Sequence, residues 1–264
     1  MYLPLTAALA ELVIVEEVGS TNDELLAIAH GAPEFTAVVT TSQTGGRGRL
    51  GRTWVAPSGE SLAISLLLRP RLPAGEPLEL TRWGWIPLMA GVAMTRTVAS
   101  LLPAREVGLK WPNDVLVGGR KVSGILAELL PGGDGLVLGA GLNLTIPADR
   151  LPTPTSTSLA IEGLALRGDE LVDAACSSWL REFRPVYTEF LRLGGDEAGS
   201  GVLDLVSELC STLGRQVTVK LPSGENLIGA AIDLDRSGRL RIKRETDGRV
   251  QAVAAGDVTH LRYE

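Results

Sequence analysis

Three arginines in a glycine-rich stretch could bind an anion. Residues 42–54, SQTGGRGRLGRTW, contain Arg47, Arg49 and Arg52 but no acidic residue. Glycines let backbone N–H groups approach an anion closely, and each arginine can donate paired hydrogen bonds to a carboxylate or a phosphate. Such a charge-assisted bond contributes about 1.5–3 kcal/mol where water is excluded. The pattern predicts a loop that encloses a nucleic acid, the phosphates of a nucleotide or a small carboxylate, whereas a lone arginine would indicate only a solvated loop.

Trp54 follows these arginines directly in the chain. A tryptophan in a loop can stack on a purine or cover an apolar ligand, because its indole ring is large and flat. It can equally anchor the loop in the hydrophobic core. The sequence leaves both interpretations open.

Two lysines mark a second candidate stretch, residues 108–128 (GLKWPNDVLVGGRKVSGILAE). Lys110 and Lys121 are two of only four lysines among 25 basic residues, and a compact ammonium group fits between closely spaced oxygens where a planar guanidinium does not. Pro112 ends the first strand, so Asn113 and Asp114 are expected on a turn that faces a cleft. The alternatives are an ordinary turn role for Asp114 and an exposed strand-edge charge for Lys121.

Two shorter stretches carry further polar side chains. In GSTN, residues 19–22, Ser20 or Thr21 can cap a helix, and with Asn22 they place several polar groups at one helix terminus. Capping is the commoner role of such residues, but it is compatible with ligand binding. In GAGLN, residues 139–143, small residues let a ligand approach a strand, and Asn143 can both donate and accept hydrogen bonds.

Hydrophobic periodicity and turn residues indicate the elements that position these stretches. Apolar and β-branched runs are interspersed with helical patterns, which predicts an α+β fold with helices packed on a mixed β-sheet. The expected strands are 12–18, 35–42, 61–68, 107–111, 121–130 and 136–145, and the expected helices are 20–31, 83–102, 169–193 and 200–213.

The sequence pattern changes near residue 213. Residues 216–221 (QVTVKL) and 239–244 (RLRIKR) alternate apolar with polar side chains, and turns separate short strands about ten residues apart. This spacing is typical of a small antiparallel β-barrel. We therefore expect one domain at 1–213, which carries the candidate ligand-binding residues, and a C-terminal β-barrel domain at 214–264.

Composition disfavours several classes of protein. The 264 residues carry a net charge of −6, which argues against a nucleic-acid-binding protein. No apolar run approaches the roughly 20 residues of a membrane span, and the N-terminus lacks the basic segment of a signal peptide. Cys176 and Cys210 are isolated in apolar patterns, so we expect buried packing residues and no disulfide or metal pair. These features predict a cytoplasmic protein.

Missing motifs narrow the chemistry further. The chain has no GxxxxGK[ST] phosphate loop, no dinucleotide-binding fingerprint directly after a strand and opening a helix, and no HExxH or paired CxxC motif. His30 and His260 are its only histidines, and neither stands in a plausible catalytic triad. Serine–histidine hydrolysis and zinc chemistry are therefore not expected.

In this order, the four stretches resemble the biotin–protein ligases, also called biotin–[acetyl-CoA-carboxylase] ligases. The match runs from GSTN through SQTGGRGRLGRTW, SLAISLLLRP, KWPNDVLVGGRKVSGILAE and GAGLN to HLR at 260–262, which is nearly the whole chain. The resemblance implies the biotin/lipoate ligase catalytic fold followed by an SH3-like β-barrel. Only about a dozen residues precede the first expected strand, so we expect the short form of the family, without an N-terminal DNA-binding domain and without specific, salt-resistant DNA binding.

The resemblance also implies two half-reactions. Biotin's carboxylate attacks the α-phosphorus of Mg²⁺-bound ATP to give biotinyl-5′-AMP and pyrophosphate, and a lysine of a biotin carboxyl carrier domain then displaces AMP. By similarity, Lys121 and Arg49 are catalytic, Asp114 is a possible contact for the Mg²⁺ of ATP, and no dedicated metal site is expected. The implied biotin-binding residues are Ser20, Thr21, Asn22, Gln43, Gly46, Arg47, Gly48, Arg49, Lys121 and Gly124. The implied ATP-binding residues are Arg49, Arg52, Trp54, Lys110, Asn113, Asp114, Lys121 and Asn143.

Two loop positions depart from the family pattern, and several alternatives stay open. Leu50 stands where a basic residue is common, and Gly45 stands where alanine is frequent. A lipoate or octanoate ligase or transferase of related fold is the alternative enzyme. A single-strand nucleic-acid binder is disfavoured by the acidic charge and by the single aromatic residue beside the arginines. A non-catalytic biotin sensor is the third alternative, and the protein is expected to be a monomer or a homodimer.

Overall fold

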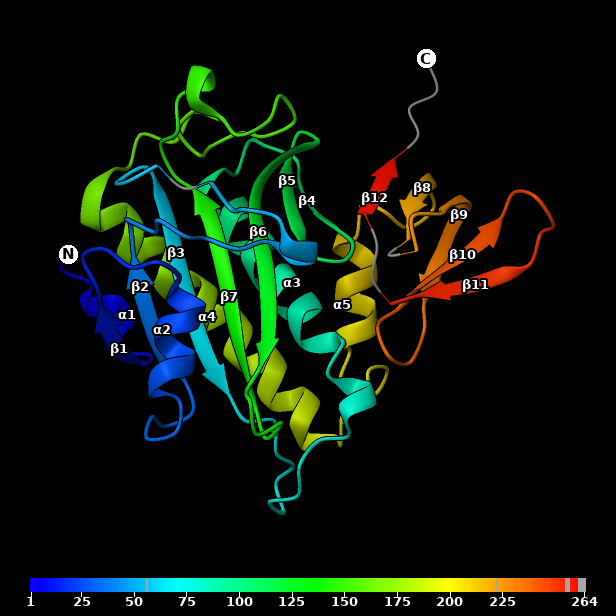
Figure 1. Ribbon diagram of the computed structural model, residues 1–264, viewed down its shortest axis with the longest axis horizontal. Coiled ribbons are helices and arrows are strands. Elements are labelled where there is room, and N and C mark those ends of the chain that lie inside the picture. Colours follow the sequence, from blue (N-terminus) through cyan, green and yellow to red (C-terminus); the bar gives the residue numbers. More distant parts are fainter. Residues whose placement is uncertain (56, 222, 255–256, 261–264) are drawn as a thin grey trace.

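The structure is a computed structural model that describes residues 1–55, 57–221, 223–254 and 257–260 (Figure 1). A seven-stranded mixed sheet with helices packed on it forms the larger part, and a five-stranded antiparallel sheet formed by the C-terminal segment lies beside it. The predicted α+β class and the C-terminal SH3-like barrel are thus confirmed. The last two residues of the HLR sequence lie outside the described residues.

The larger sheet has the strand order β1-β2-β3-β7-β6-β5-β4. β1 pairs parallel with β2, and every other neighbouring pair is antiparallel. The central strands are apolar on both faces because both faces are covered by other parts of the chain. The strands are β1 (Glu11–Ile14), β2 (Thr36–Thr40), β3 (Ser61–Leu68), β4 (Val107–Lys110), β5 (Asp114–Val117), β6 (Arg120–Leu129) and β7 (Leu136–Asn143).

Helices cover the two faces of this sheet unequally. The long helices α3 (Trp85–Leu101) and α4 (Gly168–Arg192) belong to the main hydrophobic core, together with alternate residues of β3 such as Ile64 and Leu66. The single helix α2 (Thr21–Ile28) packs with Leu67 in a smaller core on the other face. Because side chains alternate along a strand, Ala63 and Ser65 also point to that second face. Two short helices, α1 (Pro4–Ala7) and α5 (Val202–Leu209), complete the set.

The C-terminal sheet is held against the larger part of the molecule by two buried tryptophans. Its turn at residues 235–239 accepts a hydrogen bond from Trp85 Nε1 at the Arg236 carbonyl (2.9 Å) and one from Trp111 Nε1 at the Gly238 carbonyl (3.1 Å). The sheet order is β11-β10-β9-β8-β12. Its strands are β8 (Gln216–Lys220), β9 (Asn226–Leu234), β10 (Leu240–Arg244), β11 (Val250–Val253) and β12 (Asp257–His260).

The structure corrects one predicted element. Asp114 was expected on a turn after Pro112, but it is the first residue of β5, a four-residue strand that pairs with both β4 and β6. Asn113 does lie in the turn, together with Trp111 and Pro112. Two turns follow one another so closely here that the apolar residues between them are too few to show a period. The predicted division at residue 213 stays a prediction, and β8 begins shortly after it.

Candidate active site

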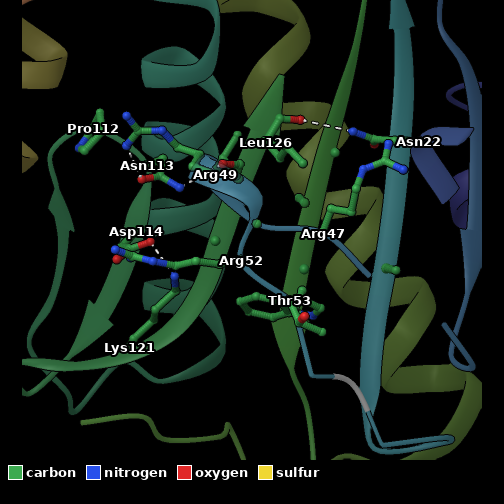
Figure 2. Close-up of a pocket in the computed structure, with 18 of the residues that line it drawn as sticks. Asn22, Arg47, Arg49, Arg52, Thr53, Pro112, Asn113, Asp114, Lys121 and Leu126 are labelled. Atoms are coloured by element: carbon green, nitrogen blue, oxygen red, sulfur yellow. Dashed lines mark hydrogen bonds and ion pairs between the residues drawn. The ribbon is translucent and has the colours of Figure 1, made fainter. Parts of the chain in front are cut away.

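A cavity of about 390 Å³ lies on the face of the seven-stranded sheet that α2 covers only in part (Figure 2). Its volume is within the roughly 300–1,000 Å³ typical of small-molecule sites. Its floor consists of small residues on three neighbouring strands, where larger side chains would fill the space. These residues are Ala63 of β3, Gly139 and Gly141 of β7, and Gly124 of β6. A Cβ atom on Gly139 would collide with Asn22 Oδ1, so this floor also lets α2 approach the sheet.

One end of the cavity holds neutral polar side chains that bond to one another. Thr21 donates to Gln43 Oε1 through its backbone N–H at 2.9 Å and through its hydroxyl at 3.1 Å. The buried Ser65 hydroxyl lies 2.7 Å from Thr21 Oγ1 and 2.6 Å from Asn22 Oδ1. This end is therefore fixed in shape before any ligand arrives.

The predicted side-chain capping by Ser20 or Thr21 is wrong. Ser20 occupies the N-cap position of α2, but its hydroxyl makes no capping bond. Gln43 supplies the acceptor for the first backbone N–H of the helix instead. The buried Ser20 side chain is consequently left on the cavity wall.

Arg47 lies at the neutral end, and the fold neutralises its charge. Its guanidinium forms ion pairs with Asp23 of α2 and with Glu128 of β6, the latter at 2.9 Å. Asn22 Nδ2 donates to the same Glu128 carboxylate at 2.6 Å. The hydrogen bonds that Arg47 donates to Asp23 and Glu128 hold the pKa of its guanidinium above its ordinary value. The sequence shows no acid within the loop, but two acids from other elements occupy this side chain, which points toward Asn22 in Figure 2.

The opposite end of the cavity carries excess positive charge. Asp114 is the single carboxylate among the described lining residues, and Figure 2 places it beside Arg52 and Lys121. Burial lowers the pKa of Arg49 and of Lys110 below their ordinary values because the charged forms lose hydration, and Asp114 opposes both shifts. Four cations facing one carboxylate favour the binding of an anion.

Asn113 fixes Arg49 within this cationic end. Arg49 Nη1 donates to Asn113 Oδ1 at 3.0 Å, while Asn113 Nδ2 donates to the Ile125 carbonyl at 2.9 Å. The backbone N–H of Ile125 donates in turn to the Asn113 carbonyl at 2.9 Å. The guanidinium is thereby tied to β6 through a neutral amide and keeps its charge available.

Lys121 reaches the cavity because β6 contains a bulge. Its ammonium pairs with Asp114 Oδ1 at 2.6 Å and lies 5.4 Å from the centre of the Trp54 ring. The register between β5 and β6 shifts so that Val122 has no partner. Residues three apart on a regular strand point to opposite faces, but the extra residue brings Lys121 and Gly124 to the same face. The bulge thus places an ammonium group beside the glycine floor.

Trp54 covers part of that floor. A Cβ atom on Gly141 would lie 2.5 Å from Trp54 Cε2, so the indole packs directly on the β7 backbone. Its Nε1 is buried without a hydrogen-bond partner among the described residues. The sequence left open whether this residue anchors the loop or meets a ligand, and the structure has it packed at the cavity wall.

Two predicted site residues do not line the cavity. Gly46 belongs to the glycine-rich loop but is not among the lining residues, and its carbonyl accepts the Trp54 backbone N–H at 2.9 Å. Asn143 is 1% exposed and donates to the Thr157 carbonyl at 2.9 Å, while its Oδ1 has no partner among the described residues. The structure brings the other predicted residues together around the cavity. These are Ser20, Thr21, Asn22, Gln43, Arg47, Gly48, Arg49, Arg52, Trp54, Lys110, Asn113, Asp114, Lys121 and Gly124.

Sequence reasoning missed the residues that support the cavity from behind. Ser65 sits in an apolar strand, and its position opposite Gly139 follows only from the strand pairing. Asp23 and Glu128 are ordinary charged residues in the sequence, 24 and 81 positions from the arginine they bind. Ser65, a serine inside the otherwise apolar run 62–68 of β3, was the one signal that could have been noticed.

Two absences concern the described part of the chain. No group of three or more His, Cys, Asp or Glu side chains there could hold a metal ion. Nor does any helix there have both the length and the apolar character that crossing a membrane requires.

Two family models match the chain. The model of the biotin/lipoate A/B protein ligase family matches residues 18–143, which include every cavity-lining residue except Val258. The model of the biotin protein ligase C-terminal domain matches residues 212–261. The first match thus covers β2 to β7 of the seven-stranded sheet, and the second covers the strands of the five-stranded sheet.

Individual relatives are similar over nearly the full length. The biotin–[acetyl-CoA-carboxylase] ligase of Mycobacterium tuberculosis is 37% identical over 256 residues, covering 96% of this chain and 90% of that protein. A biotin protein ligase from Aquifex aeolicus, solved with biotin and ATP, has a TM-score of 0.73 at 26% identity, covering 96% of this chain and 99% of that one. A ligase from Leishmania major, solved with biotinyl-5-AMP, has a TM-score of 0.61 at 27% identity, covering 93% and 99%.

Proposed function

The chain belongs to the biotin protein ligase family, and from this premise we propose which of its residues carry the reaction. It is a ligase that activates biotin with ATP to biotinyl-5′-AMP and transfers the biotinyl group to a protein lysine. The observation that supports the assignment of residues is the division of one cavity into a neutral end and a cationic end. Biotin has the same division, because a neutral ring system is joined to a carboxylate tail.

The neutral end is the proposed seat of the biotin ring. A ureido group presents both N–H donors and a carbonyl acceptor, and Ser20, Thr21, Asn22 and Gln43 offer hydroxyl and amide partners for each of them. Thr21, Asn22 and Gln43 are already held in one hydrogen-bond network with Ser65, so little conformational entropy is lost when they exchange partners for the ligand. The glycine floor leaves room for the apolar part of the ring and tail.

The cationic end is where the two anions meet. The carboxylate oxygen of biotin attacks the α-phosphorus of ATP, a P–O bond forms, and the bond to pyrophosphate breaks. We assign Lys121 to the space between the carboxylate and the α-phosphate, because its ammonium is already aimed at an oxygen of Asp114 and can exchange that partner for the substrates. Arg49 neutralises charge on the phosphoryl oxygens, and the backbone around Arg47 and Gly48 holds the carboxylate.

The nucleotide takes the remaining residues of the cationic end. Arg52 and Lys110 face the phosphates, and Asn113 keeps Arg49 in place. Asn143 lies on the same face of β7 as Gly141, which Trp54 covers. We propose that Trp54 moves off this seat to cover the purine, which would expose the unpaired Asn143 Oδ1 to a donor on the base.

Magnesium enters with ATP as part of the substrate. A single lining carboxylate, Asp114, fits a role in which the triphosphate carries most of the ligands and the protein adds one contact. The ion would supply charge neutralisation at the phosphoryl oxygens. Lys121 and Arg49 do the same from the protein side.

The second half-reaction needs an amine acceptor from outside. A lysine of a biotin carboxyl carrier domain attacks the acyl carbon of biotinyl-5′-AMP, an amide bond forms, the amine loses a proton and AMP leaves. The similarity to a biotin–[acetyl-CoA-carboxylase] ligase over nearly the whole chain supports this acceptor class and favours biotin over lipoate or octanoate.

Biotin-dependent exchange of pyrophosphate into ATP tests the proposal. The wild-type protein should catalyse exchange with biotin and none with lipoate. Lys121→Ala should lower kcat by roughly 10²–10³-fold with a nearly unchanged KM for biotin, because it removes an interaction formed mainly in the transition state. Absence of exchange in the wild type, or full activity of Lys121→Ala, would contradict the assignment.

A further inference from the structure

Glu162 is a buried carboxylate outside the cavity that no step above uses. The residue is 6% exposed, and three other side chains bind its carboxylate. Arg120 Nη2 lies 2.6 Å from its Oε1, Arg105 Nε lies 3.5 Å from its Oε2, and the Thr157 hydroxyl donates to Oε1 at 2.6 Å. Burying a carboxylate is costly unless it is paired and hydrogen-bonded, so such a cluster calls for a structural explanation.

The segment that Glu162 holds lies directly against Lys121. Pairing between β6 and β7 begins only at Ser123, so Lys121 has no β7 neighbour on that side. Residues 155–157 take the place of β7 there. Lys121 N–H donates to the Thr155 carbonyl at 2.8 Å, and Thr157 N–H donates to the Lys121 carbonyl at 2.8 Å. The backbone N–H and carbonyl of Lys121 are therefore both hydrogen-bonded to this segment.

The same segment reaches a second predicted site residue. The Thr157 carbonyl accepts the bond from Asn143 Nδ2 at 2.9 Å, and Leu159 N–H donates to the Asn143 carbonyl at 3.0 Å. Thr157 thus touches Lys121 through its N–H, Asn143 through its carbonyl and Glu162 through its hydroxyl. One fully buried threonine links the carboxylate to both residues.

Arg120 adds a second route from the carboxylate to the lysine. It is the residue immediately before Lys121 on β6, and its guanidinium is bound to Glu162 at 2.6 Å. Glu162 therefore supports the bulge in two ways, through Arg120 on β6 and through Thr157 on the neighbouring segment. A displacement of about 1 Å at a reacting centre can cost roughly a hundredfold in rate, so such support matters for an ammonium that must sit between two substrates.

We propose that Glu162 is a positioning residue for adenylation, acting through Thr157 and Arg120 on the backbone of Lys121. The proposal rests on the role assigned to Lys121 under the proposed function. It predicts that loss of the carboxylate lowers the rate of the chemical step and leaves the neutral, biotin-ring end of the cavity unaffected, since that end is fixed by the separate contacts of Thr21, Gln43 and Ser65.

Two conservative variants test the proposal in the pyrophosphate exchange assay. Glu162→Gln removes the charge and keeps the shape, and Thr157→Val removes only the hydroxyl. Each should lower kcat roughly tenfold, with the KM for biotin within about twofold of wild type. If Glu162→Gln fails to fold, Thr157→Val decides the question, because it leaves the two arginine pairs in place.

Glu197→Gln is the matched control. Glu197 is also a buried carboxylate, 9% exposed and paired with Arg82 at 2.5 Å, but neither residue lines the cavity. This variant should lower the melting temperature to a similar extent and keep a wild-type kcat. A loss of kcat equal to that of Glu162→Gln would show a general effect of instability and would overturn the proposal.

A double-variant cycle gives the sharper readout. In the Lys121→Ala background, Glu162→Gln and Thr157→Val should cause little further loss, because no ammonium remains to be positioned. Losses that add in full, or a wild-type kcat for both single variants, would overturn the role of Glu162. A wild-type protein without biotin-dependent exchange would instead refute the proposed function, so the two failures are distinguishable.

Discussion

The two ends of the cavity are built on different physical principles. At the neutral end, Thr21, Asn22, Gln43 and Ser65 bond to one another, and even Arg47 is matched by two acids. At the cationic end, burial opposes the charges of Arg49 and Lys110, and the described lining residues supply one carboxylate against four cations. The neutral end is stable without a ligand, whereas the cationic end is completed by its anionic substrates. Binding of the ring and chemistry at the phosphate are thereby separated in space.

The largest expected difference concerns Arg49 and Arg47, which are two positions apart in one loop. Arg49→Gly should keep some adenylation but release biotinyl-5′-AMP, because the positive charge that faces the acyl phosphate is lost. The measurement is the fraction of intermediate that stays bound through gel filtration. Arg47→Gly is the control and should leave nucleotide binding nearly unchanged, since Asp23 and Glu128 already neutralise this side chain. Unchanged retention of biotinyl-5′-AMP by Arg49→Gly would contradict the expected difference between Arg49 and Arg47.

At the neutral end, Gln43→Leu should affect binding without affecting chemistry. It removes an amide assigned to the ureido ring and the acceptor that orients Thr21, and a buried polar group left unpaired in the complex costs roughly 1–3 kcal/mol, which corresponds to a KM for biotin about 5- to 150-fold higher. kcat at saturating biotin should stay near wild type. Thr44→Val, an exposed neighbour, is the control. A fall in kcat equal to the rise in KM would show that the two ends are not separable.

A change in the glycine floor between the two ends of the cavity should have an effect of intermediate size. Gly141→Ala places a methyl group 2.5 Å from the Trp54 ring, so the indole must leave its seat. Because Trp54 is assigned to the nucleotide, the KM for ATP should change by roughly threefold to tenfold, while the KM for biotin changes less. Gly31→Ala, where a Cβ meets no atom within 4 Å, is the control. A larger change in the KM for biotin than in the KM for ATP would contradict the assignment of Trp54 to the nucleotide.

The smallest expected effect is on stability. Burial lowers the pKa of Lys110 in the folded state, so between that value and its ordinary pKa the unfolded chain binds more protons, and folding becomes more favourable as pH rises. Lys110→Met should therefore raise the melting temperature at neutral pH and reduce its increase toward pH 10, while lowering activity. Thr21→Val at the neutral end should lower the melting temperature instead. Thermal unfolding across pH distinguishes the two, and a stabilising role for Lys110 at neutral pH would contradict the difference between the ends.

The sequence predicts the parts of this site that depend on local composition. The glycine-rich loop, the rare lysines and the strand 61–68 are visible as patterns, and the fold class follows from the periodicity. The bulge at Val122 is not visible, because it depends on how many residues β5 and β6 each contribute to a turn. The partners of Arg47 and the link from Glu162 to Lys121 are not visible either, since they join residues far apart in the chain. Local chemistry is encoded locally, but the compensation of buried charge depends on the tertiary fold.

The two indole hydrogen bonds to the turn at residues 235–239 have a consequence for protein engineering. Trp111 immediately precedes the Pro112–Asn113 segment that fixes Arg49, so its indole hydrogen bond links the C-terminal barrel to the position of Arg49. Grafting a barrel from a relative onto this chain would succeed only if the donor's turn presents a carbonyl at the position of Gly238. Otherwise a chimera would lose catalytic rate even though every residue that touches the substrates had been retained.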